Sequence, residues 1–244
     1  MGTAIVVTSG KGGTGKTSIT GGVAGSLARL GHSVLCIDMD IGLRNLDISL
    51  GLSDRALMDF SDVAEGRCPL VRAAVNHPDL PGLALLTAPM TLSSALTEEA
   101  VRRMLDTARS LYDYVLIDSP AGLGTGFRMA CCGADRAIVV STNDASSLRD
   151  AQRTVGELDF LRQIHLVMNR IQPKLLRQLR TTIDDAMDTA GLPLLGVVPE
   201  DPQVMLSANL GRPLILGGRQ GAAIACLNIA KRLEGRRVPI MRIR

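Results

Sequence analysis

The chain has 244 residues, of which 46% are hydrophobic, and carries a net charge of +3 at pH 7. A chain of this length can bury one sizeable core, and α/β chains of this size often form a single domain. The small net charge does not indicate nucleic acid as a partner, and aromatic residues, at 2% of the chain, are too few for base-stacking platforms. Composition therefore favours a globular protein that does not bind nucleic acid.

Short apolar runs alternate with longer segments of helical periodicity along the chain. The runs expected to form buried strands are residues 4–7, 34–37, 83–86, 114–117, 137–140, 164–167 and 194–198. The clearest helical segments are residues 98–111 and 173–190, and the last helix is expected to end near Leu233. This alternation predicts an α/β fold with a mainly parallel twisted sheet covered by helices on both faces. We expect one domain over residues 1–235 and a short basic and apolar tail over residues 236–244.

The first apolar run leads into a glycine-rich loop. Residues 10–17 read Gly-Lys-Gly-Gly-Thr-Gly-Lys-Thr and open a helix-compatible stretch, which is the strand, loop and helix setting of a phosphate-binding P-loop. Lys16 is predicted to bridge the β- and γ-phosphates, and Thr17 to hold Mg²⁺. A P-loop that binds nucleotide without hydrolysing it is the alternative. The predicted nucleotide contacts here are Gly10, Lys11, Gly12, Gly13, Thr14, Gly15, Lys16, Thr17 and Ser18.

Carboxylates follow two further apolar runs. The second predicted strand ends in Asp38 and Asp40, and the fourth ends in Asp118, which is the Walker B pattern. In open α/β sheets ligands bind at the carboxyl ends of the strands. Each aspartate taken singly is equally well explained as a helix cap or turn residue. Three of them behind a P-loop favour a metal site that includes Thr17 and Asp118.

Five segments together carry a resemblance to a known family. They are residues 6–13 (Val-Val-Thr-Ser-Gly-Lys-Gly-Gly), 40–47 (Asp-Ile-Gly-Leu-Arg-Asn-Leu-Asp), 118–122 (Asp-Ser-Pro-Ala-Gly), 146–150 (Ser-Ser-Leu-Arg-Asp) and 196–201 (Gly-Val-Val-Pro-Glu-Asp). With its second loop lysine, Lys11, the chain resembles the MinD/ParA family of deviant Walker A ATPases. The Gly-Leu-Arg-Asn-Leu-Asp stretch is similar to the MinD branch, the septum-site-determining ATPases. The resemblance implies a single-domain P-loop NTPase.

The resemblance also implies roles that the residues alone leave open. It implies ATP and Mg²⁺ as ligands, bound in an ATP-dependent homodimer in which Lys11 reaches the nucleotide of the opposite subunit. Lys11 and Lys16 are the implied catalytic lysines, and Asp40 is implied to orient the attacking water with help from Asn45. Asp38 is implied to support the Mg²⁺ shell as a metal residue. The implied base-side contacts are Asn169, Arg170, Pro199, Glu200 and Asp201. Asn169 resembles the adenine-reading asparagine of the family, and a turn residue is its alternative role.

The implied function is placement of the division septum. The resemblance implies MinC-like and MinE-like partners that dock on the helix after residues 146–150, an anionic membrane surface, and a cytoplasmic location at the inner face of the cell membrane. Gln152 replaces an acidic residue that is frequent in the family, so the MinE relationship rests on fewer matches. Two alternatives stay open: a ParA/Soj-type partition ATPase that binds nonspecific DNA, and a regulator of flagellar number.

The end of the chain departs from the family, whose members usually finish in a lysine-rich amphipathic helix. Here Pro239 would interrupt a helix in the tail. The four tail arginines contribute about 1 kcal/mol each near anionic lipid, which gives one chain only millimolar-scale binding. Two tails in a dimer bind more tightly through effective concentration. A frayed basic terminus is the alternative.

We predict no catalytic or ligand-binding role for several other basic residues, histidines and cysteines. Lys174, Arg177 and Arg180 recur at helical spacing, which a solvated helix face explains. The three histidines have no metal-ligand spacing. Five cysteines in a chain without a signal-peptide pattern predict reduced thiols in the cytoplasm. Cys131 and Cys132 are expected to be buried apolar residues rather than ligands of an iron–sulfur cluster.

Overall fold

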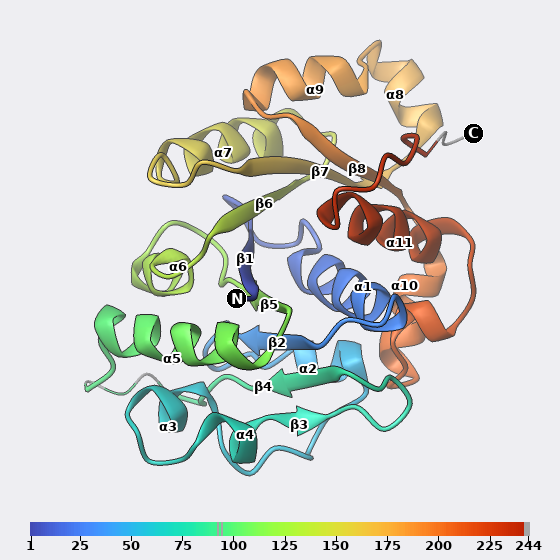
Figure 1. Cartoon of the computed structure of the whole chain (residues 1–244). Helices are drawn as coiled ribbons and strands as arrows, with labels where there is room; N and C mark the ends of the chain where they lie inside the picture. The colour runs from blue at the N-terminus through green and yellow to red at the C-terminus, as the bar shows by residue number, and fades with distance from the viewer. Residues whose placement is uncertain (92, 94, 242–244) are drawn as a thin grey trace.

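The computed structural model describes residues 1–91, 93 and 95–241. Its strands are β1 (Thr3–Thr8), β2 (Val34–Asp38), β3 (Val75–Asn76), β4 (Leu83–Leu86), β5 (Tyr114–Asp118), β6 (Arg136–Ser141), β7 (Ile164–Ile171) and β8 (Leu194–Pro199). In the part of the chain so described they form one eight-stranded sheet in the order β3-β4-β2-β5-β1-β6-β7-β8 (Figure 1). Every neighbouring pair is parallel except β3 and β4, which are antiparallel. The mainly parallel sheet is thus confirmed, with an antiparallel edge strand that the sequence did not reveal.

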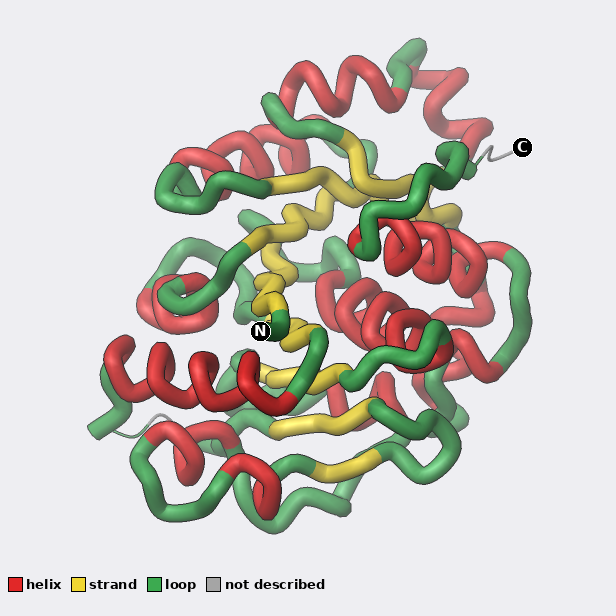
Figure 2. The backbone as a smooth tube through the Cα atoms, in the orientation of Figure 1, coloured by secondary structure: helices red, strands yellow, loops and turns green. Residues whose placement is uncertain are grey.

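Helices cover both faces of this sheet (Figure 2). They are α1 (Lys16–Arg29), α2 (Leu46–Leu50), α3 (Phe60–Ala64), α4 (Leu70–Ala73), α5 (Glu98–Leu111), α6 (Thr125–Cys131), α7 (Ala145–Gly156), α8 (Pro173–Leu179), α9 (Ile183–Ala190), α10 (Pro202–Asn209) and α11 (Gly221–Leu233), with a 3₁₀ turn at Leu214–Leu216. One layer contains α1 and α11 in mutual contact, and the other contains α5 and α7. The strands lie buried between the two layers, as expected.

The alternation of side chains along β1 shows why the strands read as continuous apolar runs. Ala4 and Val6 lie in the core cluster on the face of α5 and α7, whereas Ile5 and Val7 lie in the cluster on the face of α1 and α11. Successive strand side chains point to opposite faces, and both faces of a parallel sheet are covered. Each strand residue therefore has to be apolar, and all four are fully buried.

The prediction of one continuous helix over residues 173–190 was wrong. The structure divides it into α8 and α9 at Arg180, whose φ of 51° is left-handed. Thr182 then caps α9: its side chain accepts a hydrogen bond from Asp185 N, while the Asp185 carboxylate accepts one from Thr182 N. This capping box starts a new helix. Arg180 therefore lies beyond α8 rather than on it.

The described part of the tail folds back onto the domain. After α11 ends at Leu233, as predicted, residues 236–241 form no helix. The Arg232 guanidinium donates hydrogen bonds to the carbonyl oxygens of Val238 and Pro239, with distances of 3.0 Å and 2.6 Å from Nη2. Met241 packs against the core layer of α1 and α11. Residues 242–244 of the predicted tail lie outside the described residues.

The adjacent cysteines at the end of α6 match their predicted burial. Cys131 and Cys132 are both buried, as predicted, and burial raises the pKa of their thiols to about 12 and about 11. Such thiols are inert at neutral pH. None of the described helices has the length and apolar character needed to cross a bilayer.

Candidate nucleotide-binding site

The loop between β1 and α1 leaves the N-terminus of α1 open. Gly15 precedes α1 with a φ of 90°, and no side chain caps the helix. A Cβ atom on Gly15 would lie 2.3 Å from Asn169 Nδ2, and one on Gly10 would lie 2.4 Å from the carbonyl oxygen of Asp150. Both positions therefore require glycine. The uncapped helix N-terminus, with its free N–H groups and positive dipole end, suits an anion.

Lys16 places its ammonium group inside this loop. Its side chain is largely buried, with 8% of the residue exposed, and Nζ donates to Ser9 Oγ at 3.1 Å. The same serine hydroxyl donates to the carbonyl oxygen of Lys11 at 2.6 Å. Burial lowers the pKa of Lys16, while the charges of Asp118 and Asp40 raise it. No described carboxylate forms an ion pair with Lys16, so its charge is available for a phosphate.

Asp118, at the end of β5, is buried beside the first turn of α1. It accepts hydrogen bonds from Thr17 Oγ1 at 2.6 Å and from Thr20 Oγ1 at 3.2 Å. Burial raises the pKa of Asp118 to about 7 and that of Asp38 to about 6. The register of the sheet pairs these two aspartates across β2 and β5. Two desolvated carboxylates beside a threonine hydroxyl are oxygen donors of the kind that Mg²⁺ prefers.

Asp38 also anchors the segment that follows it. Its carboxylate accepts hydrogen bonds from the backbone N–H groups of Asp40, at 2.9 Å, and Leu46, at 3.1 Å. Burial raises the pKa of the half-buried Asp40, and the charge of Lys16 lowers it, so Asp40 lies within electrostatic reach of the P-loop. Asn45 is exposed immediately before α2 and its side chain makes no capping hydrogen bond. The fold thus brings Asp40 to the loop and leaves Asn45 at the surface.

Lys11 is held by its own subunit. Its Nζ lies 2.7 Å from Asp144 Oδ1 and donates to Ser146 Oγ at 2.8 Å, both at the start of α7. Burial disfavours ionisation of Asp144, but hydrogen bonds from Lys11, Thr142 and Ser146 outweigh it and hold the pKa of that carboxyl well below its usual range. Sequence reasoning singled out Lys11 and missed Asp144. The side chains join residues 133 positions apart, and no local pattern signals such a contact.

A pocket of about 400 Å³ opens beside the P-loop. The predicted residues that line it are Ser18, Asn169, Arg170, Pro199, Glu200 and Asp201. Asn169 Nδ2 donates to the carbonyl oxygen of Thr14 at 2.8 Å, which fixes the side-chain amide and leaves its oxygen as an acceptor. Arg170 pairs with Glu200, with 2.8 Å between Nε and Oε2. A mostly apolar pocket with a few fixed polar groups suits a nucleobase.

Asp201 lines this pocket but its carboxylate is engaged elsewhere. Oδ1 accepts from the N–H of Gln203 at 2.9 Å, in the first turn of α10, and Oδ2 accepts from the N–H of Ala222 at 2.8 Å, in the first turn of α11. One side chain therefore caps two helices. A direct contact between Asp201 and a nucleobase stays a prediction.

Residues 5–214 match the family described as the CobQ/CobB/MinD/ParA nucleotide binding domain. The chain belongs to this family. It is 39% identical to the septum site-determining protein MinD of Synechocystis sp. over 97% of the chain and 91% of that protein. It is 41% identical to the Bacillus subtilis protein of that name, over 98% of the chain and 92% of the relative. The predicted resemblance is thereby confirmed.

Solved structures of the family superpose closely on the chain. The MinC:MinD cell division protein complex from Aquifex aeolicus matches with a TM-score of 0.91 and 37% identity, covering 98% of both chains. MinD complexed with Mg-ADP from Pyrococcus horikoshii matches with a TM-score of 0.84 and 28% identity, covering 96% of both chains. A ParA family ATPase from Chlorobium tepidum, at 21% identity and a TM-score of 0.82, shares the fold.

Proposed function

We propose that this chain is a switch ATPase that binds Mg·ATP, dimerises with it, hydrolyses it and takes part in division-site selection. The observation that carries the proposal is the convergence of Lys16, Thr17, Asp40 and Asp118 at the open N-terminus of α1. Lys16 and the loop amides meet the phosphates. Asn169 lines the proposed base pocket, and in this proposal its side-chain oxygen accepts a hydrogen bond from the 6-amino group of adenine.

Thr17 and Asp118 are the residues that would hold Mg²⁺, with Asp38 behind them. When bound, Mg²⁺ supplies positive charge to the β- and γ-phosphate oxygens. No cluster of three or more His, Cys, Asp or Glu side chains suited to a metal occurs among the described residues. That agrees with Mg²⁺, which usually takes one or two carboxylates and completes its shell with phosphate and water oxygens.

In this proposal Asp40 positions the water that hydrolyses ATP. A water oriented by the Asp40 carboxylate attacks the γ-phosphorus as the bond from that phosphorus to the bridging oxygen breaks. ADP leaves with the bridging oxygen, the proton lost by the water passes to the phosphate product, and Lys16 stabilises the charge that develops. The two hydrogen bonds from the Asp40 and Leu46 amides to Asp38 fix the segment that carries Asp40. Asn45 assists from the same segment once a second subunit covers it.

Dimerisation requires Lys11 to leave Asp144 and Ser146. The ion pair with Asp144 is half-exposed, with 34% and 50% of the two side chains accessible, so it contributes at most about 1 kcal/mol. A charge-assisted contact with the phosphates of the opposite subunit is stronger. We therefore infer an ATP-dependent homodimer in which the lysine exchanges its partner.

The cellular part of the proposal comes from the relatives. Septum site-determining proteins match nearly the whole chain, and the Aquifex MinD is found in a complex with MinC. We propose MinC-like and MinE-like partners and a cytoplasmic location at the inner face of the membrane. In this proposal residues 1–235 are the ATPase domain, and residues 236–244 attach the dimer to anionic lipid.

The test separates binding, hydrolysis and assembly. Lys16→Ala should lose nucleotide binding, whereas Asp40→Ala should bind ATP and turn it over at least a hundredfold more slowly. Light scattering should then find the Asp40→Ala dimer with ATP and only monomer in the Lys11→Ala, Asp40→Ala double variant. Wild-type turnover in Asp40→Ala would remove this residue from the mechanism. Equal dimer fractions in the last two variants would refute the role of Lys11.

A further inference from the structure

α8 is the one helix of the described α-helices without a buried residue. Leu175 and Leu179 are 40% and 50% exposed and lie one turn apart, so they form one stripe on the helix surface. Leu176 packs against the core instead. Figure 1 shows α8 at the upper right edge of the molecule. The two exposed leucines cost free energy in water and stabilise nothing within the domain.

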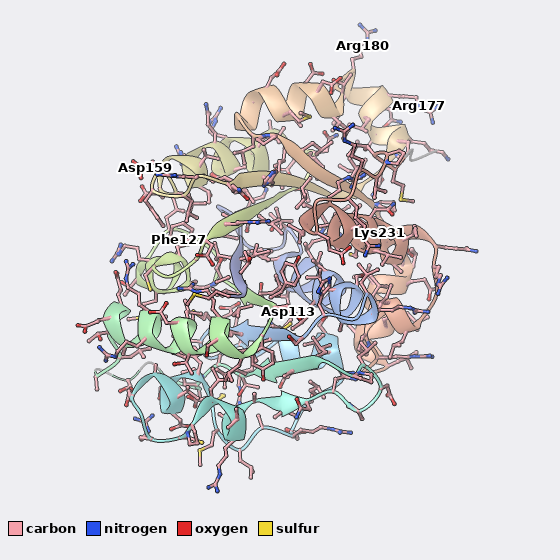
Figure 3. All side chains as sticks on the ribbon, viewed as in Figure 1. Asp113, Phe127, Asp159, Arg177, Arg180 and Lys231 are labelled. Carbon is pink, nitrogen blue, oxygen red and sulfur yellow. The ribbon has the colours of Figure 1, made fainter. Side chains whose placement is uncertain are left out.

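Cations accompany the leucines. Lys174, Arg177 and Arg180 are exposed, and no ion pair joins them to a carboxylate within the described residues. Figure 3 shows Arg177 and Arg180 pointing away from the body of the protein. Residues 171–182 include no Asp or Glu. A solvated helix face explains the cations but not the two leucines between them.

We propose that α8, through Leu175, Leu179 and its flanking cations, is a lipid-facing surface for an anionic membrane. Lysine and arginine attract anionic headgroups, and apolar side chains on the same short helix enter the boundary between headgroups and acyl chains. A nucleic acid would engage the cations alone and leave the leucines in water. The combination therefore fits an anionic bilayer better than a nucleic acid or a purely acidic peptide.

This inference rests on the membrane attachment proposed above and adds a second contact to the tail. Each cation at an anionic surface contributes about fivefold in affinity, so a single α8 is a weak anchor. Two copies in an ATP dimer act together through their effective concentration. Attachment through α8 consequently depends on dimerisation.

The test uses the full chain with Mg·ATP and vesicles of phosphatidylcholine with or without phosphatidylglycerol. Lys174→Gln, Arg177→Gln removes two cations from each subunit and should weaken sedimentation with the anionic vesicles at least about 25-fold at low salt. Leu175→Ser, Leu179→Ser keeps every charge and should also weaken binding, by about tenfold, including at high salt. Arg102→Gln, Arg103→Gln on the exposed face of α5 removes the same charge elsewhere and should change binding less than threefold.

Four results decide the matter. Wild-type affinity in both α8 variants would overturn the inference while leaving attachment through the tail intact. A loss in the charge variant that the α5 control matches would also overturn it, because net charge would then suffice. Loss of nonspecific DNA binding without loss of vesicle binding would assign the surface to nucleic acid. If the wild-type protein with ATP does not sediment with anionic vesicles, this inference and the membrane proposal both fail. Light scattering still tests dimerisation independently.

Discussion

Replacing Asp118 by Asn should stabilise the nucleotide-free protein at pH 8. Burial raises the pKa of Asp118 from 3.8 to about 7, so ionising it in the folded chain costs about 4 kcal/mol. Asn is neutral but keeps only one acceptor oxygen for the hydroxyls of Thr17 and Thr20, and the lost hydrogen bond costs about 1–2 kcal/mol. The net gain of about 2 kcal/mol corresponds to a melting temperature higher by about 6 °C.

The sign depends on pH. The unfolded chain releases the proton of Asp118 near pH 3.8 and the folded chain near pH 7. Between these values the folded state holds more protons, so the free energy of unfolding of the wild-type protein falls as pH rises. Asn does not titrate. The variant should therefore melt below the wild type at pH 4 and above it at pH 8.

Thermal melts in EDTA, followed by circular dichroism at pH 4 and pH 8, measure this reversal. The exposed Asp159→Asn is the matched control and should show none. With Mg·ATP at pH 8 the order should change again, because the wild-type carboxylate gains its cation and the variant does not. An Asp118→Asn protein that is destabilised equally at both pH values would refute the argument from burial.

Three further variants test single contacts. Gly15→Ala should abolish ATP binding measured by calorimetry and lower the free energy of unfolding by about 1–3 kcal/mol, because φ is 90° and the new Cβ would lie 2.3 Å from Asn169 Nδ2. Unchanged ATP affinity would show that the loop adapts. Asn169→Ala should reduce the preference for ATP over GTP about tenfold in competition binding, and an unaltered preference would place base recognition elsewhere. Arg232→Gln should speed tryptic cleavage after Arg236 several-fold without altering ATP turnover, since the tail loses its hydrogen bonds; equal cleavage rates would mean that packing of Met241 suffices.

Local patterns predicted which residues meet at the proposed phosphate side of the site. The P-loop and the aspartates after β2 and β5 are contiguous motifs at strand ends, and a parallel sheet brings such ends to one edge. The strand order places Asp38 opposite Asp118. The sequence therefore carried both the chemistry of these residues and, through the fold class, their neighbourhood.

Contacts between distant segments escaped prediction. The partners of Lys11 lie more than 130 positions away, and the fold-back of the tail depends on one arginine reaching backbone carbonyls, which have no sequence signature. The break at Arg180 is a different matter. Thr182 and Asp185 have the spacing of a capping box, which predicts the start of a helix. Helical periodicity continues through these residues, however, and the prediction followed that longer pattern instead of the local start signal.

The double role of Asp201 has a mechanical consequence. Its carboxylate ties the first turns of α10 and α11 together at the wall of the base pocket. α11 is a stiff rod of 13 residues, about 20 Å long, and Arg232 near its far end holds the tail. α11 also packs against α1 and β8, so the helix is held along its length as well as at its first turn. One packed helix thus connects the Asp201 carboxylate, beside the proposed base pocket, to the backbone carbonyls of the tail that Arg232 binds.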